Sequence, residues 1–176
     1  MDLVAPDPAL FPSFRASMRE WDGAHQDGAG IRDAASLLER EGFETWVAQL
    51  LAEEAEPAGP GFVTCTYRWL VEDGEYLGSV ALRHELNDFL ARFGGHVGYG
   101  VRPSARGRGL ATQALRGILP FARRRGIDEV LVICDELNPA SRTVIERCGG
   151  RFEDAVQDDD GRTLRRYWIA ADSRAR

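Results

Sequence analysis

The sequence predicts one α/β domain of the α+β type, with a mixed, mostly antiparallel central sheet of about six to seven strands flanked by helices. The chain has 176 residues, 44% of them hydrophobic, which is enough for one buried core. A Gly/Pro-rich segment at 57–61 separates a helical first third from a strand-rich remainder. Two hairpin patterns and one strand–helix–strand unit follow it, so the sheet should combine antiparallel pairs with one parallel pair.

Apolar spacing and turn residues define the elements before residue 95. A period near 3.6 predicts helices, alternation predicts strands, and Asp73–Gly74 marks a hairpin turn between two of the strands. Gly94 is expected to close a short third helix. The predicted elements are helices over 9–21, 44–54 and 87–93 and strands over 62–71 and 76–82.

The second half carries the strand–helix–strand unit and a final hairpin. Its predicted elements are strands over 96–101, 129–134, 151–156 and 163–170 and helices over 107–125 and 139–148. The last helix has an explicit start, because Asn138 can cap it and Pro139 fits its first position. We assign residues 1–172 to the domain and 173–176 to a disordered tail.

The composition excludes several classes of function. All 22 basic residues are arginine, which removes Schiff-base lysines and the phosphate-binding lysine of P-loops. A net charge of -6 disfavours a nucleic-acid partner. The longest apolar run, 130–134, is far too short to span a membrane, and the first residues lack a secretion signal. Three cysteines in apolar surroundings fit a reducing, cytoplasmic location.

The turn between the strand at 96–101 and the following helix predicts an anion site. Gly107 and Gly109 allow backbone amides to approach a ligand, and the helix N-terminus adds its positive end. No carboxylate occurs between residues 89 and 127. The arginines expected around the site, without a nearby counter-charge, are Arg102, Arg106 and Arg108. A dinucleotide-binding turn is the rival interpretation, but Thr112 stands where its third glycine belongs.

The segment Arg106-Gly-Arg-Gly-Leu-Ala111 resembles the pyrophosphate-binding motif of the GNAT superfamily of acyl-CoA-dependent N-acyltransferases. Residues 138–149 resemble its second motif, the helix beside the pantetheine arm, and residues 82–99 are similar to a bacterial subgroup of predicted acetyltransferases. The resemblance implies that the parallel strands splay apart. It also implies transfer of an acetyl group from acetyl-CoA, or another short acyl-CoA, to a primary amine by direct attack in a ternary complex, without a metal.

The same resemblance assigns the residues that bind the acyl-CoA. The pantetheine amides would pair with backbone near Tyr99 and Val101, and the amides of 106–111 would hold the pyrophosphate. Asn138, Ser141 and the spare arginines would complete the contacts. The full expected set is Tyr99, Val101, Arg102, Arg106, Gly107, Arg108, Gly109, Leu110, Ala111, Asn138 and Ser141.

Two groups are needed to move protons. His96 is our candidate general base, because imidazole titrates near neutrality and this residue starts the strand beside the acyl site. The alternatives are His84, Glu85, Asp135, Glu136, or a purely structural His96. For the departing thiolate, Ile145 occupies the position where the family often has tyrosine, so Ser141, one turn earlier, becomes the candidate acid. Tyr99, Tyr167 and solvent remain alternatives.

The acceptor is expected to be an amine on a small molecule or peptide. Residues 1–60 contain twelve carboxylates and four arginines, so a cationic acceptor is one hypothesis and a solvated acidic surface is the other. A non-catalytic acyl-CoA-binding module and a nucleotide-binding regulatory domain are the competing functions. We expect no nucleic-acid or membrane partner, and we leave a monomer and a homodimer both open.

Overall fold

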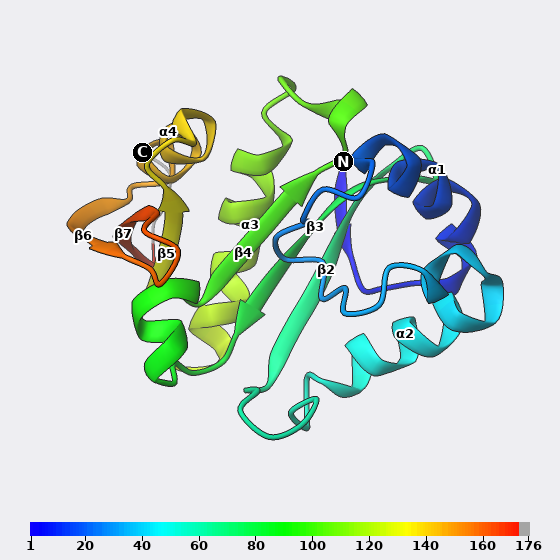
Figure 1. The fold of residues 1–176 in the computed structure, drawn as a ribbon, viewed down its shortest axis with the longest axis horizontal. Helices are drawn as coiled ribbons and strands as arrows, with labels where there is room; N and C mark the ends of the chain where they lie inside the picture. Colours follow the sequence, from blue (N-terminus) through cyan, green and yellow to red (C-terminus); the bar gives the residue numbers. More distant parts are fainter. Residues whose placement is uncertain (173–176) are drawn as a thin grey trace.

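A seven-stranded sheet separates two helical layers in the computed structural model, which describes residues 1–172 (Figure 1). The strand order is β1-β2-β3-β4-β5-β7-β6, and every neighbouring pair is antiparallel except β4 and β5. The strands are β1 (Asp2–Val4), β2 (Cys65–Glu72), β3 (Glu75–Arg83), β4 (Val97–Val101), β5 (Glu129–Asp135), β6 (Arg151–Gln157) and β7 (Thr163–Ala170). The predicted mixed, mostly antiparallel sheet is therefore confirmed.

Four α-helices cover the sheet, two on each face. One face is covered by α1 and α2, and the other by α3 and α4. Their bounds are α1 (Phe11–Trp21), α2 (Arg40–Ala52), α3 (Leu110–Arg124) and α4 (Pro139–Arg147). The shorter helical turns are η1 (Pro8–Leu10), η2 (Ser36–Leu38), the π-type η3 (Leu90–Gly94) and η4 (Pro103–Ala105). No helix in the described part of the chain is long and apolar enough to cross a membrane.

Alternating side chains of the strands build two separate cores. On the α1/α2 face, Phe14, Phe43 and Trp69 are fully buried and lie within aromatic contact distance of one another. On the α3/α4 face, aliphatic residues dominate, with Leu115 and Ile118 of α3 completely buried against the sheet. Apolar burial on both faces holds the middle strands rigidly, and the site described below depends on that rigidity.

The structure corrects some predicted boundaries. The N-terminal strand β1 was not predicted, because three residues are too few for a periodicity to be recognised. The second strand begins at Cys65 rather than at 62, and α2 spans Arg40–Ala52 rather than 44–54. The short helix near 87–93 ends in a π turn at Gly94, and Gly95, with φ of 66°, terminates it. The predicted tail at 173–176 lies outside the described residues.

Candidate active site

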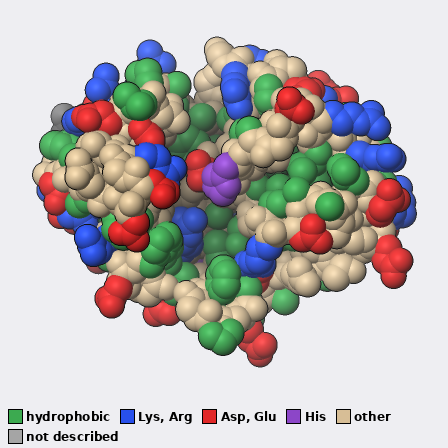
Figure 2. Space-filling view, in the orientation of Figure 1, with side chains coloured by type: hydrophobic (Ala, Val, Ile, Leu, Met, Phe, Trp, Pro, Cys, Tyr) green, Lys and Arg blue, Asp and Glu red, His purple; other side chains and the backbone are tan. Residues whose placement is uncertain are grey.

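Strands β4 and β5 diverge in the middle of the sheet. Their one registered residue pair within the described chain is Val97 with Val132. Just before it, the His96 N–H donates to the Leu131 carbonyl at 2.7 Å. In Figure 1 the part of the sheet formed by β5, β6 and β7, together with α4, stands apart from the part formed by β1 to β4. Figure 2 shows a hollow between these two parts on the same side of the molecule.

Backbone donors of β4 face this gap. The Arg102 N–H donates to the Leu77 carbonyl of β3 at 2.8 Å, so it points away from β5. Because successive N–H groups of a strand alternate in direction, those of Val101 and Tyr99 point toward β5. A ligand with its own amide groups could pair with them as an additional strand.

The turn before α3 presents a row of free amides. Gly107 and Gly109 have φ values of 78° and 77°, a backbone region that favours glycine, and a Cβ at either position would meet open space. Gly109 caps α3 without a side-chain hydrogen bond. Within residues 1–172, no group accepts a hydrogen bond from the N–H groups of 107–112. These amides, at the positive end of a 15-residue helix, are arranged to hold an anion such as a pyrophosphate.

The predicted absence of counter-charges around this turn is wrong for two of the three arginines. Arg102 is paired with Glu20 at 2.6 Å and Glu75 at 3.1 Å, and its side chain is only 12% exposed. Arg108 forms an ion pair with Glu72. These carboxylates come from segments distant in the chain, so local sequence could not show them. Arg102 is thus occupied structurally, and the expectation that it contacts the cofactor is not supported by its geometry.

Arg106 keeps its charge unpaired by any carboxylate of the described residues. Its Nε donates to the Val101 carbonyl at 3.2 Å, and its guanidinium lies 4.9 Å from the centre of the Trp21 ring. Both contacts hold the side chain across the exposed turn without neutralising it. Arg106 is therefore the arginine of the motif that remains available to an anion.

A pair of hydroxyl groups bridges the gap between β4 and α4. The Tyr99 hydroxyl lies 2.9 Å from the Ser141 Oγ and 3.3 Å from the Ser141 carbonyl oxygen. Asn138 accepts a hydrogen bond from the Ser141 N–H at 3.0 Å, which fixes the first turn of α4. Burial raises the pKa of Tyr99, so its hydroxyl keeps its proton. Ile145 is fully buried in the core and carries no polar group into the gap.

His96 is engaged by the main chain. Its Nδ1 accepts a hydrogen bond from the Leu131 N–H at 2.9 Å, and the residue is 7% exposed. Burial, with a further contribution from the nearby Arg83 charge, lowers the pKa of His96 to about 4. Neutral His96 therefore carries its proton on Nε2 and has no free lone pair. This geometry disfavours the prediction that His96 is the general base and favours its structural alternative.

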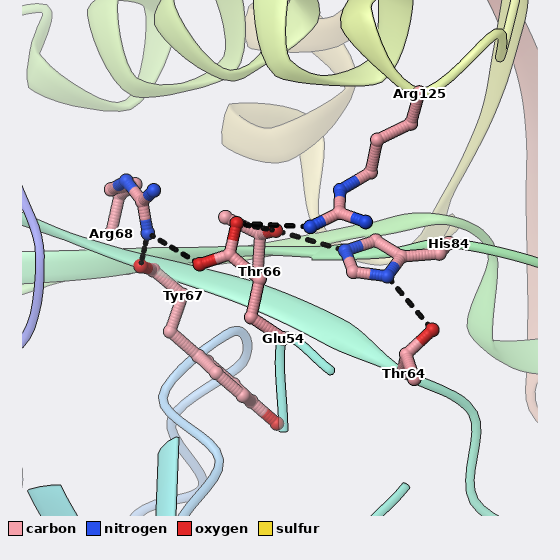
Figure 3. Close-up of polar contacts among 7 residues, drawn as sticks. All are labelled: Glu54, Thr64, Thr66, Tyr67, Arg68, His84 and Arg125. Carbon is pink, nitrogen blue, oxygen red and sulfur yellow. Dashed lines mark hydrogen bonds and ion pairs between the residues drawn. The ribbon is translucent and has the colours of Figure 1, made fainter. Parts of the chain in front are cut away.

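The other predicted proton acceptors are also occupied or remote. Figure 3 shows His84 between two threonines, with Nδ1 2.8 Å from the Thr64 hydroxyl and Nε2 2.8 Å from the Thr66 hydroxyl. Thr66 in turn donates to Glu54, which pairs with Arg125 at the end of α3. This network joins α2, β2, β3 and α3 and serves the fold. Of the remaining candidates, Asp135 caps the Leu137 N–H, Glu136 pairs with Arg165, and Glu85 is exposed.

A pocket of about 430 Å³ opens on the α1/α2 face, beside β4. The loop between α1 and α2 forms one wall: Gly28 lies against the backbone of Gly98, where a Cβ would come within 2.2 Å of the carbonyl oxygen. His25 and Asp27 of this loop are 3.1 Å apart and largely exposed. The Asp27 carboxylate is close enough to Tyr99 to contribute to the raised pKa of that residue. The sequence analysis missed this loop, whose only signal is its three glycines at 23, 28 and 30.

Most carboxylates of the first 60 residues that lie near these sites are neutralised by arginines. Glu53 is 4% exposed, accepts two hydrogen bonds from Arg32 and a third from the Tyr67 hydroxyl. Glu20 is used by Arg102. The acidic excess of the N-terminal third therefore does not produce an acidic pocket. Among the described residues, no three His, Cys, Asp or Glu side chains gather to hold a metal ion.

Comparisons with known proteins agree with this geometry. No curated protein sequence matches the chain at a significant level. Three solved structures are similar in fold: the ribosomal L7/L12 alpha-N-protein acetyltransferase RimL in complex with coenzyme A (18% identity, 97% of this chain and 94% of that chain, TM-score 0.69); the microcin C7 self-immunity acetyltransferase MccE with acetyl-CoA and AMP (14%, 96% and 91%, 0.69); and the spermidine N-acetyltransferase SpeG from Vibrio cholerae (12%, 97% and 95%, 0.65).

The family model for the acetyltransferase (GNAT) domain matches residues 7–151. The matched range contains the divergence of β4 from β5, the free amides at 107–112, and the hydroxyl pair of Tyr99 and Ser141. These features are placed as the sequence resemblance implied. The chain belongs to the GNAT acetyltransferase family.

Proposed function

We propose that this protein transfers an acetyl group from acetyl-CoA to a primary amine of a small molecule or peptide. The observation that carries the proposal is the opening of the sheet between β4 and β5 next to a row of unpaired amides at the start of α3. One end of this arrangement fits a pyrophosphate and the other accepts an amide-bearing arm. The adjoining pocket on the α1/α2 face brings an acceptor to the end of that arm.

The chain's own residues divide the binding of acetyl-CoA among them. The amides from Gly107 to Ala111 hold the pyrophosphate, and Arg106 adds a positive charge. Tyr99 and Val101 offer N–H groups to the pantetheine, and one of these donors stabilises the negative charge that develops on the acyl oxygen. Asn138 and Ser141 contact the arm from α4, while the ion-paired Arg108 acts at the rim of the site.

The amine must lose a proton, since an alkylamine has a pKa of about 10.4. With Nδ1 of His96 occupied, we assign this task to the pair of His25 and Asp27, directly or through water. These side chains are 82% and 74% exposed, line the pocket, and belong to the loop that packs on Gly98 and Gly100 of β4. As the C–N bond forms and the C–S bond breaks, the amine proton passes to this pair.

The departing thiolate needs a proton donor in place of the absent family tyrosine. The hydroxyl pair of Tyr99 and Ser141 stands in the gap where the sulfur would leave, and Cys134 of β5 lies against Ser141. Tyr99 keeps its proton at neutral pH and can pass it on through Ser141. Protonation of the thiolate completes the transfer and releases free CoA and the acetylated amine.

The proposal is tested by following acetyl-CoA-dependent thiol release with a panel of amines: amino acids, polyamines, amino sugars and peptides with free N-termini. We expect one class to be acetylated, and the thermal midpoint to rise with CoA whether or not an amine is present. CoA binding without thiol release from any amine would instead support the non-catalytic binding module. Competition by ATP or NAD but not by CoA would support the nucleotide-binding domain.

Variants of the hydroxyl pair test its role. Tyr99→Phe and Ser141→Ala should each lower kcat roughly ten- to hundredfold while leaving the KM for acetyl-CoA nearly unchanged. The matched control is Tyr167→Phe, because Tyr167 is also a buried strand tyrosine but its hydroxyl contacts Arg165. Equal losses in all three variants would contradict a specific role for the Tyr99 hydroxyl.

The cellular setting is also part of the proposal. Cys65, Cys134 and Cys148 are all buried and free of disulfides, which suits a reducing cytoplasm. We propose that the protein acts there on a soluble amine, without a nucleic-acid or membrane partner.

A further inference from the structure

We propose that the acceptor amine also carries a carboxylate, and that Arg83 binds it in the pocket on the α1/α2 face. This inference rests on the proposed acetyl transfer and names its substrate class: amino acids and related amines with an apolar side chain. It replaces the hypothesis of a cationic acceptor, which the neutralised carboxylates of the N-terminal third do not support.

Arg83 is a positioned cation without a carboxylate partner. It lies at the end of β3, half-buried, and lines the pocket. Its NH1 group donates to the carbonyls of Gly94 and Gly95 at 2.9 and 3.0 Å, which fixes the guanidinium plane. Within the described residues, Nε and NH2 donate to no protein group, and no carboxylate lies at ion-pair distance. Three N–H donors of a rigid guanidinium thus remain for a ligand.

The charge of Arg83 stands between the pocket and the acyl site. Its NH2 is 3.8 Å from the place that a Cβ at Gly98 would occupy, so it borders β4 itself. It acts electrostatically on Cys65 at one side of the pocket and on His96 at the other, lowering the pKa of both side chains. A carboxylate on Arg83 would therefore leave the amine of a short acceptor close to the gap between β4 and β5.

The other charges of the pocket are already paired. Arg32 and Glu53 satisfy each other through two hydrogen bonds, and the third acceptor position of Glu53 is filled by Tyr67. His25 and Asp27 pair with each other nearer to Tyr99. An acceptor ammonium can approach that acidic pair while its carboxylate meets Arg83, so the two ends of an amino acid find opposite charges.

The rest of the lining favours an apolar side chain. Phe62 and Phe89 belong to the pocket although they are 54% and 65% exposed. Large aromatic side chains left in solvent beside a cavity commonly mark a binding surface. The pocket volume of about 430 Å³ lies within the usual range for small-molecule sites. An amino acid with an aromatic or aliphatic side chain matches the charge, the size and the apolar edge.

The test compares pairs of amines that differ only in the carboxylate. Phenylalanine is compared with phenethylamine and leucine with isoamylamine, each titrated calorimetrically into the protein in the presence of CoA. We expect each amino acid to bind roughly ten- to hundredfold more tightly than its decarboxylated partner. Equal affinities within the pairs, tighter binding of the decarboxylated amines, or no binding by any of the four would overturn the proposal.

Variants locate the effect. Arg83→Gln should remove the preference for the amino acid, and Arg83→Lys should keep part of it, because the charge remains but the planar donor pair is lost. Arg68→Gln is the matched control: Arg68 also donates to a backbone carbonyl from a central strand, but it faces α3 through Phe121. If Arg83→Gln retained the wild-type preference while melting as a folded protein, the carboxylate would bind elsewhere and the proposal would be wrong.

Thiol release measured on the same pairs separates this inference from the proposed function. Tight binding of amino acids by Arg83 without thiol release would count against acetyl transfer and would leave the carboxylate subsite standing. Thiol release from phenethylamine and isoamylamine at rates equal to those from the amino acids would support the transferase and refute the carboxylate subsite.

Discussion

The buried His96 should make the protein sensitive to mild acid. Its pKa is lowered to about 4, whereas a histidine in an unfolded chain titrates near 6.5. As the pH falls below 6.5, the unfolded chain binds a proton that the folded protein refuses. Stability from this group is therefore complete above about pH 7.5, is lost progressively between pH 6.5 and 4, and changes no further below that.

The size of the effect follows from the two pKa values. One unit of difference corresponds to about 1.4 kcal/mol, so the full window could remove about 3 kcal/mol. At pH 5, where the folded protein is still mostly unprotonated at His96, the loss is about 2 kcal/mol. The carboxylates whose pKa is lowered by ion pairs, such as Glu20 and Asp154, begin to contribute only at lower pH.

Urea unfolding at pH 7.5, 6.5, 5.5 and 5.0 measures this quantity in the wild type and in His96→Asn. The asparagine oxygen can accept the Leu131 N–H but does not titrate. We expect the variant to be less stable at pH 7.5 and the wild type to lose about 2 kcal/mol more than the variant by pH 5. All other titrating groups are common to both proteins, so parallel curves would refute the structural assignment of His96.

Three further predictions concern packing around the site. Arg32→Met should lower the free energy of unfolding by about 2 kcal/mol in urea titrations, because Glu53 keeps a buried charge without its bidentate partner; unchanged stability would contradict this. Gly28→Ala forces a side chain onto the Gly98 carbonyl at a φ of 74°. Its KM for the acceptor should rise while that for acetyl-CoA stays constant, and equal changes in both would argue against the loop as a pocket wall. Ile145→Tyr should cost about 1–3 kcal/mol by overpacking and leave kcat no higher; a gain in kcat would show that the tyrosine position is still functional.

The sequence predicts the elements that carry a strong local pattern. The helix after Gly109, the capped start at Asn138 and the hairpin at Asp73–Gly74 all lie where spacing and turn residues put them. The parallel pair follows from the strand–helix–strand order, and the free amides at 107–112 follow from glycines before a helix. Each of these depends on neighbours within one turn or two, which periodicity and capping describe well.

Contacts between distant segments explain what was missed. Glu20, Glu72 and Glu75 reach the arginines of the anion turn from α1, β2 and β3, and nothing near residue 106 signals their approach. Arg83 looks like any charged strand end until the carbonyls of Gly94 and Gly95 fix it beside the pocket. His96 shows the converse: an apparently catalytic residue type, whose lone pair the fold spends on a backbone amide.

The short contact between β4 and β5 couples the protein's lifetime to its supply of acetyl-CoA. With one registered pair at Val97 and Val132, the two parts of the sheet are joined mainly through the cores on either side. A bound pantetheine arm would restore hydrogen bonds along the open edge and stabilise only the folded state, by about 2.7 kcal/mol at a hundred times its Kd. When acetyl-CoA is scarce, β4 and β5 should separate more often and expose their edges to proteases. The abundance of the protein in a cell would then follow the level of acetyl-CoA even when its synthesis is constant.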